Sequence, residues 1–321
     1  VRNKNLFFSS DTEKHIDESE MIFLAVNTPT KIEGKGKGFA ADLTNIDQCA
    51  KQIAIVSSSN KIIVEKSTLP VRTAERLKEI INKHKQDDVS FEIISNPEFL
   101  AEGTAIRDLF KSDRVLIGSD QTDEGLAAME SLVNIYKNWI PKERIIKTNI
   151  WSSELSKLAS NAMLAQRISS INSLSALTEK TEAKINELSV AVGKDHRIGD
   201  KFLNVSPGFG GSCFKKDILN LVYICRQYGL EEVAEYWHQV VKINDYQRKR
   251  IFNIVNSSLV ELKNKKISIL GWSFKKDTND TRESSSIPIS SDLIINGASL
   301  KIYDPLAEKK QIIQDLTTYL E

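Results

Sequence analysis

Hydrophobic and polar positions divide the chain into three successive stretches. Up to about residue 148, short runs rich in Ile, Val, Leu and Phe alternate with stretches whose apolar residues recur at helical spacing. These patterns predict strands at 21–26, 61–65, 91–95 and 114–119, and helices at 40–56, 69–83 and 122–138. The second of these helices is expected to carry Pro at its second position. Strands that alternate with helices indicate a parallel sheet with right-handed crossovers.

The strand pattern fades after Trp151 and returns near the end of the chain. Helical spacing predicts one long helix at 152–177 and further helices at 213–228 and 231–260. Strands at 266–270 and 300–303, with a helix at 287–295, then restore the α/β pattern. The pattern therefore predicts an α/β protein of three domains: a parallel-sheet domain at 1–148, an all-α domain of long helices at 149–262 and a second α/β domain at 263–321. Two strands are too few for a stable sheet, so we expect the last domain to be incomplete.

Composition limits the kinds of partner that the protein is expected to bind and the cellular compartment in which it is expected to occur. Lys and Arg total 44 against 43 Asp and Glu, so no overall charge favours nucleic acid or a membrane surface. The longest clean apolar run, 21–26, is far too short to span a bilayer. The three cysteines cannot all pair and match no zinc spacing, and the four histidines are scattered. We expect a cytoplasmic protein that binds no metal, no nucleic acid and no membrane.

A glycine-rich segment leads into the helix expected at 213–228. Apolar residues after it recur at helical spacing, which puts Cys213 at or near the helix N-terminus, with Lys215 and Lys216 close by. Unpaired backbone N–H groups and the helix dipole favour a thiolate there. Cys213 is therefore a candidate nucleophile, and a buried structural cysteine after a turn is the alternative. Cys49 and Cys225 are expected to be structural.

Polar residues follow the ends of several expected strands. Glu98 and Glu102 follow the strand at 91–95, on the edge where open α/β sheets bind ligands. A carboxylate there can act as acid or base, or it can simply take part in turn and cap contacts. Hydroxyls and amides at 27–30 and 65–68 follow two other strands, and they suggest one polar crevice or ordinary loop polarity.

Two further groups of polar residues have a chemical and a structural interpretation. Lys157 and Asn161 are four residues apart on the long helix, so they share a face and can stabilise an oxyanion, unless the lysine is simply solvated. The segment 274–286 can hold phosphate through Lys275 and Arg282, or it is a charged loop.

Taken together, these segments resemble the UDP-glucose 6-dehydrogenase family, most strongly its animal-type members. The matching stretches occur in the family's order and cover nearly the whole chain: NLFFSS, VNTPT, EKSTLPVR, SNPEFLAEGTAI, SSELSKLASNAMLAQRISSINSLSAL, GFGGSCFKKD, NDYQRKR and FKKDTNDTRESS. The resemblance implies a Rossmann-like NAD-binding domain, a central helical domain used for dimerisation and substrate, and a Rossmann-like UDP-sugar-binding domain.

The resemblance also implies a reaction. Members of the family oxidise UDP-glucose to UDP-glucuronate, a glycosaminoglycan precursor, with two NAD⁺ and one water. By resemblance, Cys213 forms a thiohemiacetal and then a thioester, and Glu98 does acid/base work on thioester hydrolysis. Lys157 would stabilise developing charge on oxygen. Asn161, Asp217 and Thr68 match residues that place the catalytic water.

The family's ligand contacts carry over by position. Expected NAD contacts are Val26, Asn27, Thr28, Pro29, Thr30, Ser67, Thr68, Leu69, Glu102, Cys213, Lys216 and Arg282. Expected UDP-glucose contacts are Glu98, Phe99, Leu100, Ala101, Glu102, Lys157, Asn161, Arg197, Phe209, Gly210, Phe274 and Lys275. Arg197 matches an arginine supplied across a subunit interface, so a homo-oligomer is expected, built from dimers and hexameric by resemblance.

The chain departs from the family at one prominent motif. The strand, G-x-G-x-x-G and helix with which the family opens are absent, because Gly34, Gly36 and Gly38 have the wrong spacing. We therefore expect a fragment, with the missing unit before Val1 and the rest of the third domain after Glu321. Two alternatives stay open: a sister dehydrogenase for GDP-mannose or UDP-N-acetylmannosamine, or a truncated, non-catalytic oligomerising product.

Overall fold

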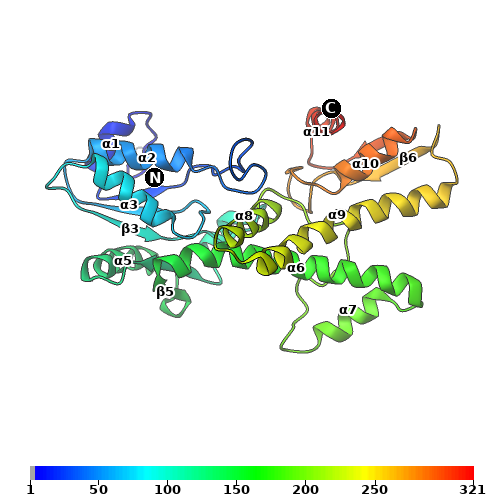
Figure 1. Ribbon diagram of the computed structural model, residues 1–321, viewed down its shortest axis with the longest axis horizontal. Coiled ribbons are helices and arrows are strands. Elements are labelled where there is room, and N and C mark those ends of the chain that lie inside the picture. The colour runs from blue at the N-terminus through cyan, green and yellow to red at the C-terminus, as the bar shows by residue number, and fades with distance from the viewer. Residues whose placement is uncertain (1–3) are drawn as a thin grey trace. The chain divides into compact units, whose positions relative to one another are not determined.

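The computed structural model describes residues 4–321 and divides the chain into two compact units, Val1–Leu158 and Ala159–Glu321. The first unit is an α/β domain (Figure 1). Its five-stranded sheet has the strand order β1-β2-β3-β4-β5. Its strands are β1 (Met21–Leu24), β2 (Lys61–Glu65), β3 (Phe91–Ser95), β4 (Val115–Ser119) and β5 (Ile145–Asn149). The expectation of an α/β fold is confirmed.

The sheet is mixed, so the prediction of a wholly parallel sheet was wrong at β4. The pairs β1–β2, β2–β3 and β4–β5 are parallel, but β4 runs antiparallel to β3 through only two residue pairs. To run parallel to β3, strand β4 would have to start at the same end of the sheet as β3. That requires a crossover connection, usually a helix, that returns the chain to that end. Between β3 and β4 the chain forms only the six-residue helix α4 (Ala105–Phe110), and β4 starts back from the edge where β3 ends.

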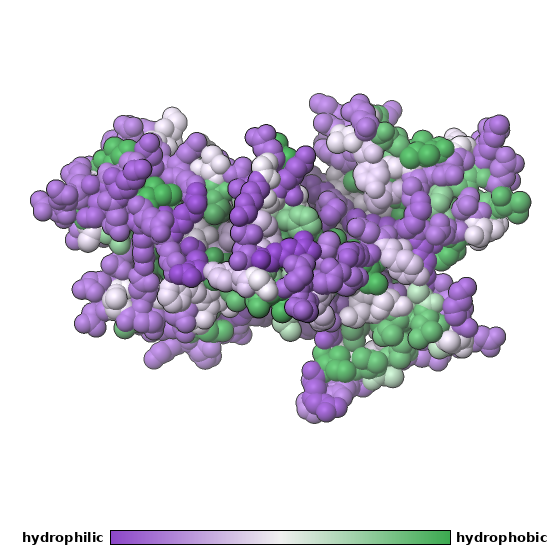
Figure 2. All heavy atoms as spheres, viewed as in Figure 1, coloured by the Kyte–Doolittle hydropathy of each residue, from purple (hydrophilic) through white to green (hydrophobic). Residues whose placement is uncertain are grey.

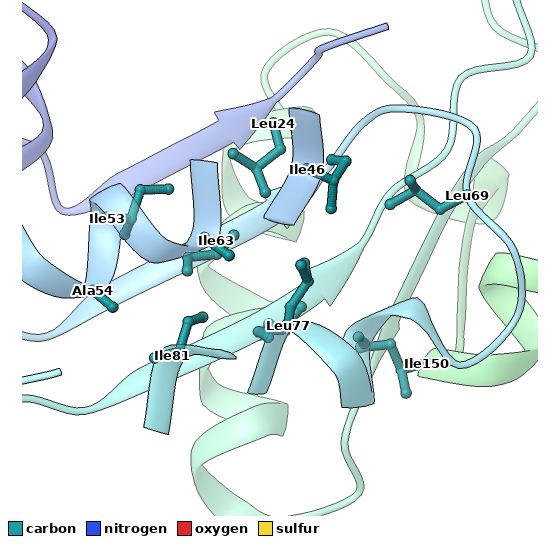
Figure 3. Close-up of a cluster of buried hydrophobic side chains, with 12 residues drawn as sticks. Leu24, Ile46, Ile53, Ala54, Ile63, Leu69, Leu77, Ile81 and Ile150 are labelled. Carbon is teal, nitrogen blue, oxygen red and sulfur yellow. The ribbon is translucent and has the colours of Figure 1, made fainter. Parts of the chain in front are cut away.

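Alternating side chains of the strands build a core on each face of this sheet. Ile63 points to one face, where it packs with Ile53 and Leu77 of the covering helices α2 (Thr44–Val56) and α3 (Thr73–His84) (Figure 3). Ile93 belongs to the same buried cluster. The next residues along the strands point to the other face, where they pack against α5 (Asp123–Tyr136). Period-two alternation thus buries both faces.

Helix α3 begins later than expected. The apolar spacing predicted a start at Leu69 with Pro70 at the second position, but the helix begins at Thr73. Arg72 before it has a left-handed backbone, with φ of 73°, and the Thr73 N–H bonds to the Pro70 carbonyl. Pro70 therefore belongs to a turn that precedes the helix. The expected start of the preceding helix was also too early, since α2 begins at Thr44.

The second unit consists mainly of long helices and ends in a two-stranded sheet. The first of these helices, α6 (Ile150–Thr181), contains the boundary between the units. It is followed by α7 (Ile185–Gly193), α8 (Phe214–Gln227) and α9 (Glu231–Leu259). The parallel strands β6 (Lys266–Leu270) and β7 (Ser299–Tyr303) are joined through α10 (Ser286–Ile295), and α11 (Lys309–Leu320) closes the chain. The two expected strands and the long helices are confirmed.

Several short elements were not expected from the sequence: α1 (Thr12–Glu18), α4, β5, a 3-10 turn (Lys142–Arg144), α7 and α11. Strand β5 shows only a weak apolar alternation, and two of its five residues are half-buried while the others are exposed. The domain boundaries at 148/149 and 262/263 stay a prediction. Among the described residues, no helix is both long and apolar enough to cross a membrane.

Candidate active site

In the first unit, the candidate residues gather where β1, β2 and β3 end. Thr28 is buried and its hydroxyl donates to the Thr68 carbonyl at 3.0 Å. The Ser67 hydroxyl donates to the Val26 carbonyl at 2.6 Å. These bonds tie the segments after β1 and β2 together, as their parallel register requires. The side chain of Leu69 is in the core, so only its backbone is available to a ligand.

Lys157 and Glu98 form a partly buried ion pair. The lysine is 4% exposed, and its Nζ lies 2.9 Å from Oε1 of Glu98. The other carboxylate oxygen accepts the Leu100 N–H at 2.6 Å, which fixes the turn after β3. Lys157 Nζ also lies 5.5 Å from the centroid of the Phe99 ring. The solvated-lysine interpretation is therefore wrong, because a buried ammonium is held against a carboxylate and an aromatic face.

Lys66, at the end of β2, adds a second ammonium group to this edge. Its Nζ donates to Oδ1 of Asn96 at 3.0 Å and to the hydroxyl of Tyr136 at 3.2 Å. Burial lowers the pKa of Lys66 to about 8; the neighbouring Glu98 opposes that shift and Lys157 adds to it. Lys66, Asn96, Glu98 and Phe99 line a cavity of about 320 Å³ beside the turn.

A buried pair of carboxyl groups lies behind this edge. Glu65 is 1% exposed, and no donor among the described residues reaches either of its oxygens. Burial, followed by the adjacent Glu154, raises the pKa of Glu65 well above its usual range. Glu154 accepts the backbone N–H groups of Arg72 at 2.5 Å and Ala74 at 2.8 Å, and burial raises its pKa to about 7. A protonated Glu65 can donate to Glu154, which satisfies both groups.

In the second unit, Cys213 is the N-cap residue of α8 and its side chain is exposed. Its Sγ lies 3.5 Å from the Ser212 hydroxyl. Asp217, one turn into the helix, is 1% exposed and accepts Nδ2 of Asn161 at 2.6 Å. Lys216 Nζ lies 2.9 Å from the other Asp217 oxygen. The expected position of Cys213 at a helix N-terminus is confirmed.

Other expected ligand residues of this unit lie on two neighbouring loops. The backbone N–H of Gly211 donates to the Arg282 carbonyl at 2.8 Å, which joins the glycine-rich loop to the segment 274–285. A Cβ on Gly210 would lie 2.5 Å from the Glu283 carbonyl oxygen and 2.8 Å from Cβ of Phe274, so only glycine fits there. Phe209 packs edge-on against Phe214, with centroids 5.9 Å apart.

Three expected contacts are charged and exposed. Arg282 pairs with Asp280 at 2.8 Å, and Arg197 pairs with Asp195 at 2.6 Å. Lys275 Nζ lies 5.8 Å from the Phe274 ring centroid. Among residues 4–321, no group of three or more His, Cys, Asp or Glu side chains could hold a metal ion.

The structure thus forms two local groups of the expected residues, one in each unit. Glu98, Phe99 and Lys157 contact one another in the first, and Asn161, Lys216 and Asp217 do so in the second. Lys157 and Asn161 are one turn apart in α6. The environments of Lys66 and of the Glu65–Glu154 pair could not be predicted from the sequence, because burial and partners distant in the sequence create them.

Comparisons with known proteins match three successive parts of the chain to the domains of one family. Residues 1–140 match the NAD-binding domain of the UDP-glucose/GDP-mannose dehydrogenase family, residues 151–246 its central domain and residues 268–320 its UDP-binding domain. UDP-glucose 6-dehydrogenase 3 of Arabidopsis thaliana is 60% identical and UDP-glucose 6-dehydrogenase 1 of Glycine max is 58% identical, both over 98% of this chain. The chain spans 66% of the length of these curated relatives. Both are plant proteins, and the stronger likeness to animal-type members stays a prediction.

Solved structures give the same result. The UDP-glucose dehydrogenase of the archaeon Pyrobaculum islandicum matches 94% of this chain, and the chain covers 68% of that protein, with a TM-score of 0.85 and 31% identity. The UDP-D-ManNAc dehydrogenase of Pyrococcus horikoshii shares the fold, with a TM-score of 0.77 at 21% identity. With three consecutive domain matches and relatives of this similarity, the chain belongs to the UDP-glucose/GDP-mannose dehydrogenase family.

Proposed function

We propose that this chain takes part in the NAD-dependent, four-electron oxidation of UDP-glucose to UDP-glucuronate. The observation that carries the proposal is the 60% identity, over 98% of the chain, to a protein named UDP-glucose 6-dehydrogenase. The exposed Cys213 at the N-terminus of α8 and the buried Lys157–Glu98 pair supply the chemical groups such a reaction needs.

The edge of the sheet in the first unit suits a nicotinamide dinucleotide. Hydroxyls and amides at 27–30 and 67–68 lie at the carboxyl ends of the parallel strands β1 and β2, where open α/β sheets bind dinucleotides. Such groups can hydrogen-bond ribose hydroxyls and the carboxamide. NAD⁺, when bound, supplies the hydride acceptor, and two are consumed for each sugar.

Cys213 is the proposed nucleophile. Its thiolate adds to the C6 aldehyde that the first oxidation produces, which forms a C–S bond and a thiohemiacetal. Loss of a second hydride converts the thiohemiacetal to a thioester, and water then cleaves the C–S bond to release the acid and the thiol. Cys213 is the N-cap residue of α8 and its side chain is exposed, so a substrate can reach the sulfur.

The remaining proposed roles concern charge on oxygen and water. Lys157 stabilises developing negative charge on the substrate oxygen, and Glu98 exchanges a proton during thioester hydrolysis. The Asn161–Asp217 pair orients the hydrolytic water. By resemblance, Thr68 is proposed as a further residue that acts through water. In support, the Lys157 ammonium and the Asp217 carboxylate are both buried and held by short polar contacts.

We also propose a homo-oligomer built from dimers. Large apolar side chains are exposed on α6 and α7, including Leu174, Leu177 and Val190. Figure 2 shows hydrophobic residues gathered where α7 and the end of α6 are labelled in Figure 1. Arg197 is 78% exposed in its side chain, which agrees with a role toward a second subunit. The cytoplasmic location and the hexamer stay predictions.

A panel of nucleotide sugars tests the proposal. The full-length protein is expected to reduce NAD⁺ with UDP-glucose and not with GDP-mannose or UDP-N-acetylmannosamine. Activity with GDP-mannose or UDP-N-acetylmannosamine alone would establish a sister enzyme instead, because those enzymes share the fold. A folded protein that neither binds NAD⁺ nor oxidises any of the three sugars would support the non-catalytic alternative.

A further inference from the structure

Helix α9 contacts the loop that leads to Cys213 through two buried side chains one turn apart, Asn244 and Arg248. They are 1% and 7% exposed. Oδ1 of Asn244 accepts the Phe209 N–H at 2.7 Å, and its Nδ2 donates to the Phe209 carbonyl at 3.1 Å. A side-chain amide therefore pairs with the backbone of Phe209 in both directions, four residues before the cysteine.

Arg248 joins that loop to a second one. Its Nη2 donates to the carbonyl of Phe209 at 2.8 Å and to the carbonyl of Glu283 at 2.6 Å, and its Nε donates to the Ser285 hydroxyl at 3.2 Å. The rigid, five-donor guanidinium fork suits this task, which a lysine ammonium cannot reproduce in full. The Glu283 carboxylate, 3.6 Å from Nη1, compensates the buried charge.

The glycine-rich loop and the 274–285 loop are in direct contact. Besides the bond from the Gly211 N–H to Arg282, Lys215 Nζ lies 3.1 Å from the Glu283 carboxylate. Glu283 has a left-handed backbone, with φ of 52°, which a residue other than glycine adopts only when its surroundings hold it there. The carbonyl of Glu283 is one of the two carbonyls that accept a hydrogen bond from Nη2 of Arg248.

Arg248 also lines a cavity of about 340 Å³, which raises the question of a ligand site. The basic side chains of that cavity already have carboxylate partners. Lys215 and Arg248 contact Glu283, and Lys249 lies 3.1 Å from Asp292. Their charge is compensated within the chain, so the contacts favour a structural role for Arg248 over anion binding.

We propose that Arg248 is a positioning residue. It holds the glycine-rich loop and the 274–285 loop in a fixed position relative to each other, and thereby fixes Cys213 at the N-terminus of α8. The consequence for turnover rests on the proposed function. The Cys213 side chain is exposed, with a single described polar contact at 3.5 Å, so its position depends on the loop backbone. The same contacts place Gly210 and Gly211 against Phe274.

The test measures the alkylation of Cys213 by iodoacetamide, located by mass spectrometry, and NADH formation from UDP-glucose, in the full-length protein. Arg248→Lys is expected to slow alkylation and to lower kcat by about tenfold or more, because small displacements of reacting groups cost that much. Lys249→Gln, which removes a charge from the next position on α9, should leave both rates unchanged. Thermal unfolding identifies the temperature at which each variant is fully folded.

A folded Arg248→Lys protein with wild-type alkylation and kcat would overturn the proposal, even if its melting temperature fell. Ser285→Ala covers the case in which Arg248 variants do not fold. This variant removes only the hydroxyl that accepts from Nε of Arg248. The alkylation rate and kcat should both fall, by a smaller factor than in Arg248→Lys. If neither rate changes, the proposal is also overturned. If the wild-type protein forms no NADH, the proposed function fails, while alkylation still decides the role of Arg248.

Discussion

Removing the carboxylate of Glu154 is expected to loosen the start of helix α3. The helix has no capping side chain of its own at Arg72, whose backbone is left-handed. Glu154, eighty residues further along the chain from Ala74, accepts the N–H groups of both Arg72 and Ala74. These are donors that the first turn of a helix cannot satisfy internally. Glu154→Ala removes this acceptor from both N–H groups.

The expected cost follows from these two bonds. A buried donor that loses its acceptor costs about 1–3 kcal/mol, so two such donors cost roughly 2–6 kcal/mol. Glu154→Gln keeps one oxygen acceptor and should cost about half as much. Glu75→Gln is the matched control, because Glu75 is in the same first turn and only pairs with Arg72 in a half-exposed contact worth less than about 1 kcal/mol.

Hydrogen exchange of the segment that starts at Arg72 measures this loss locally. In Glu154→Ala, a loss of about 3 kcal/mol corresponds to exchange roughly 100-fold faster at Arg72 and Ala74. The control should exchange as the wild-type protein does. Unchanged protection of Ala74 in Glu154→Ala would refute the capping argument.

The Glu65–Glu154 pair also predicts the direction of a pH effect. Both pKa values are raised in the folded state, that of Glu154 from 4.5 to about 7. The folded state therefore binds more protons, and the stability that the pair contributes is lost as the pH rises from 4.5 through about 7. Glu65→Gln keeps a donor toward Glu154 without the charge, so its urea midpoint should fall less than that of the wild-type protein between about pH 5 and about pH 8. An equal fall would contradict the assignment.

Three further predictions concern Lys157, the cysteines Cys213 and Cys225, and the glycine-rich loop. Lys157→Ala should lower kcat more than it raises KM for UDP-glucose, because its charge matters most in the transition state; equal effects would make it a binding residue. Cys213→Ser should abolish turnover without changing the melting temperature, whereas Cys225→Ser should lower stability by about 1–3 kcal/mol in urea denaturation and leave kcat intact. Gly210→Ala should lower kcat and the hydrogen-exchange protection of the glycine-rich loop, because the new Cβ would lie 2.5 Å from the Glu283 carbonyl oxygen. Wild-type kcat and protection would show that the two loops can move apart to fit the Cβ.

Strongly periodic elements were predictable from the sequence. The strands at 61–65, 91–95 and 266–270 lie where the apolar runs placed them, and the long helix and the helix at 231–259 are close to their expected bounds. Local pattern does not report strand direction, so the antiparallel pairing of β4 could not be seen. The start of α3 was missed because Glu154, a distant residue, satisfies its first turn.

The candidate site was predictable in part. The glycine-rich approach to a helix located Cys213 correctly at an N-cap, since that signal is local. The burial of Lys157 and the charge environment of Lys66 could not be read from spacing, because they arise from packing against the turn after β3. Arg248 occurs in one of the stretches that carry the family resemblance, yet only its contacts with two loops indicate a role.

The yield of NADH per UDP-glucose in the full-length protein shows whether the oxidation transfers four electrons. A limiting amount of UDP-glucose is consumed completely, and NADH is counted by absorbance while the sugar product is identified by mass spectrometry. We expect two NADH for each UDP-glucuronate formed, and no UDP-glucuronate from the Cys213→Ser variant. One NADH per sugar with release of an aldehyde, or two NADH from Cys213→Ser, would contradict the thioester route.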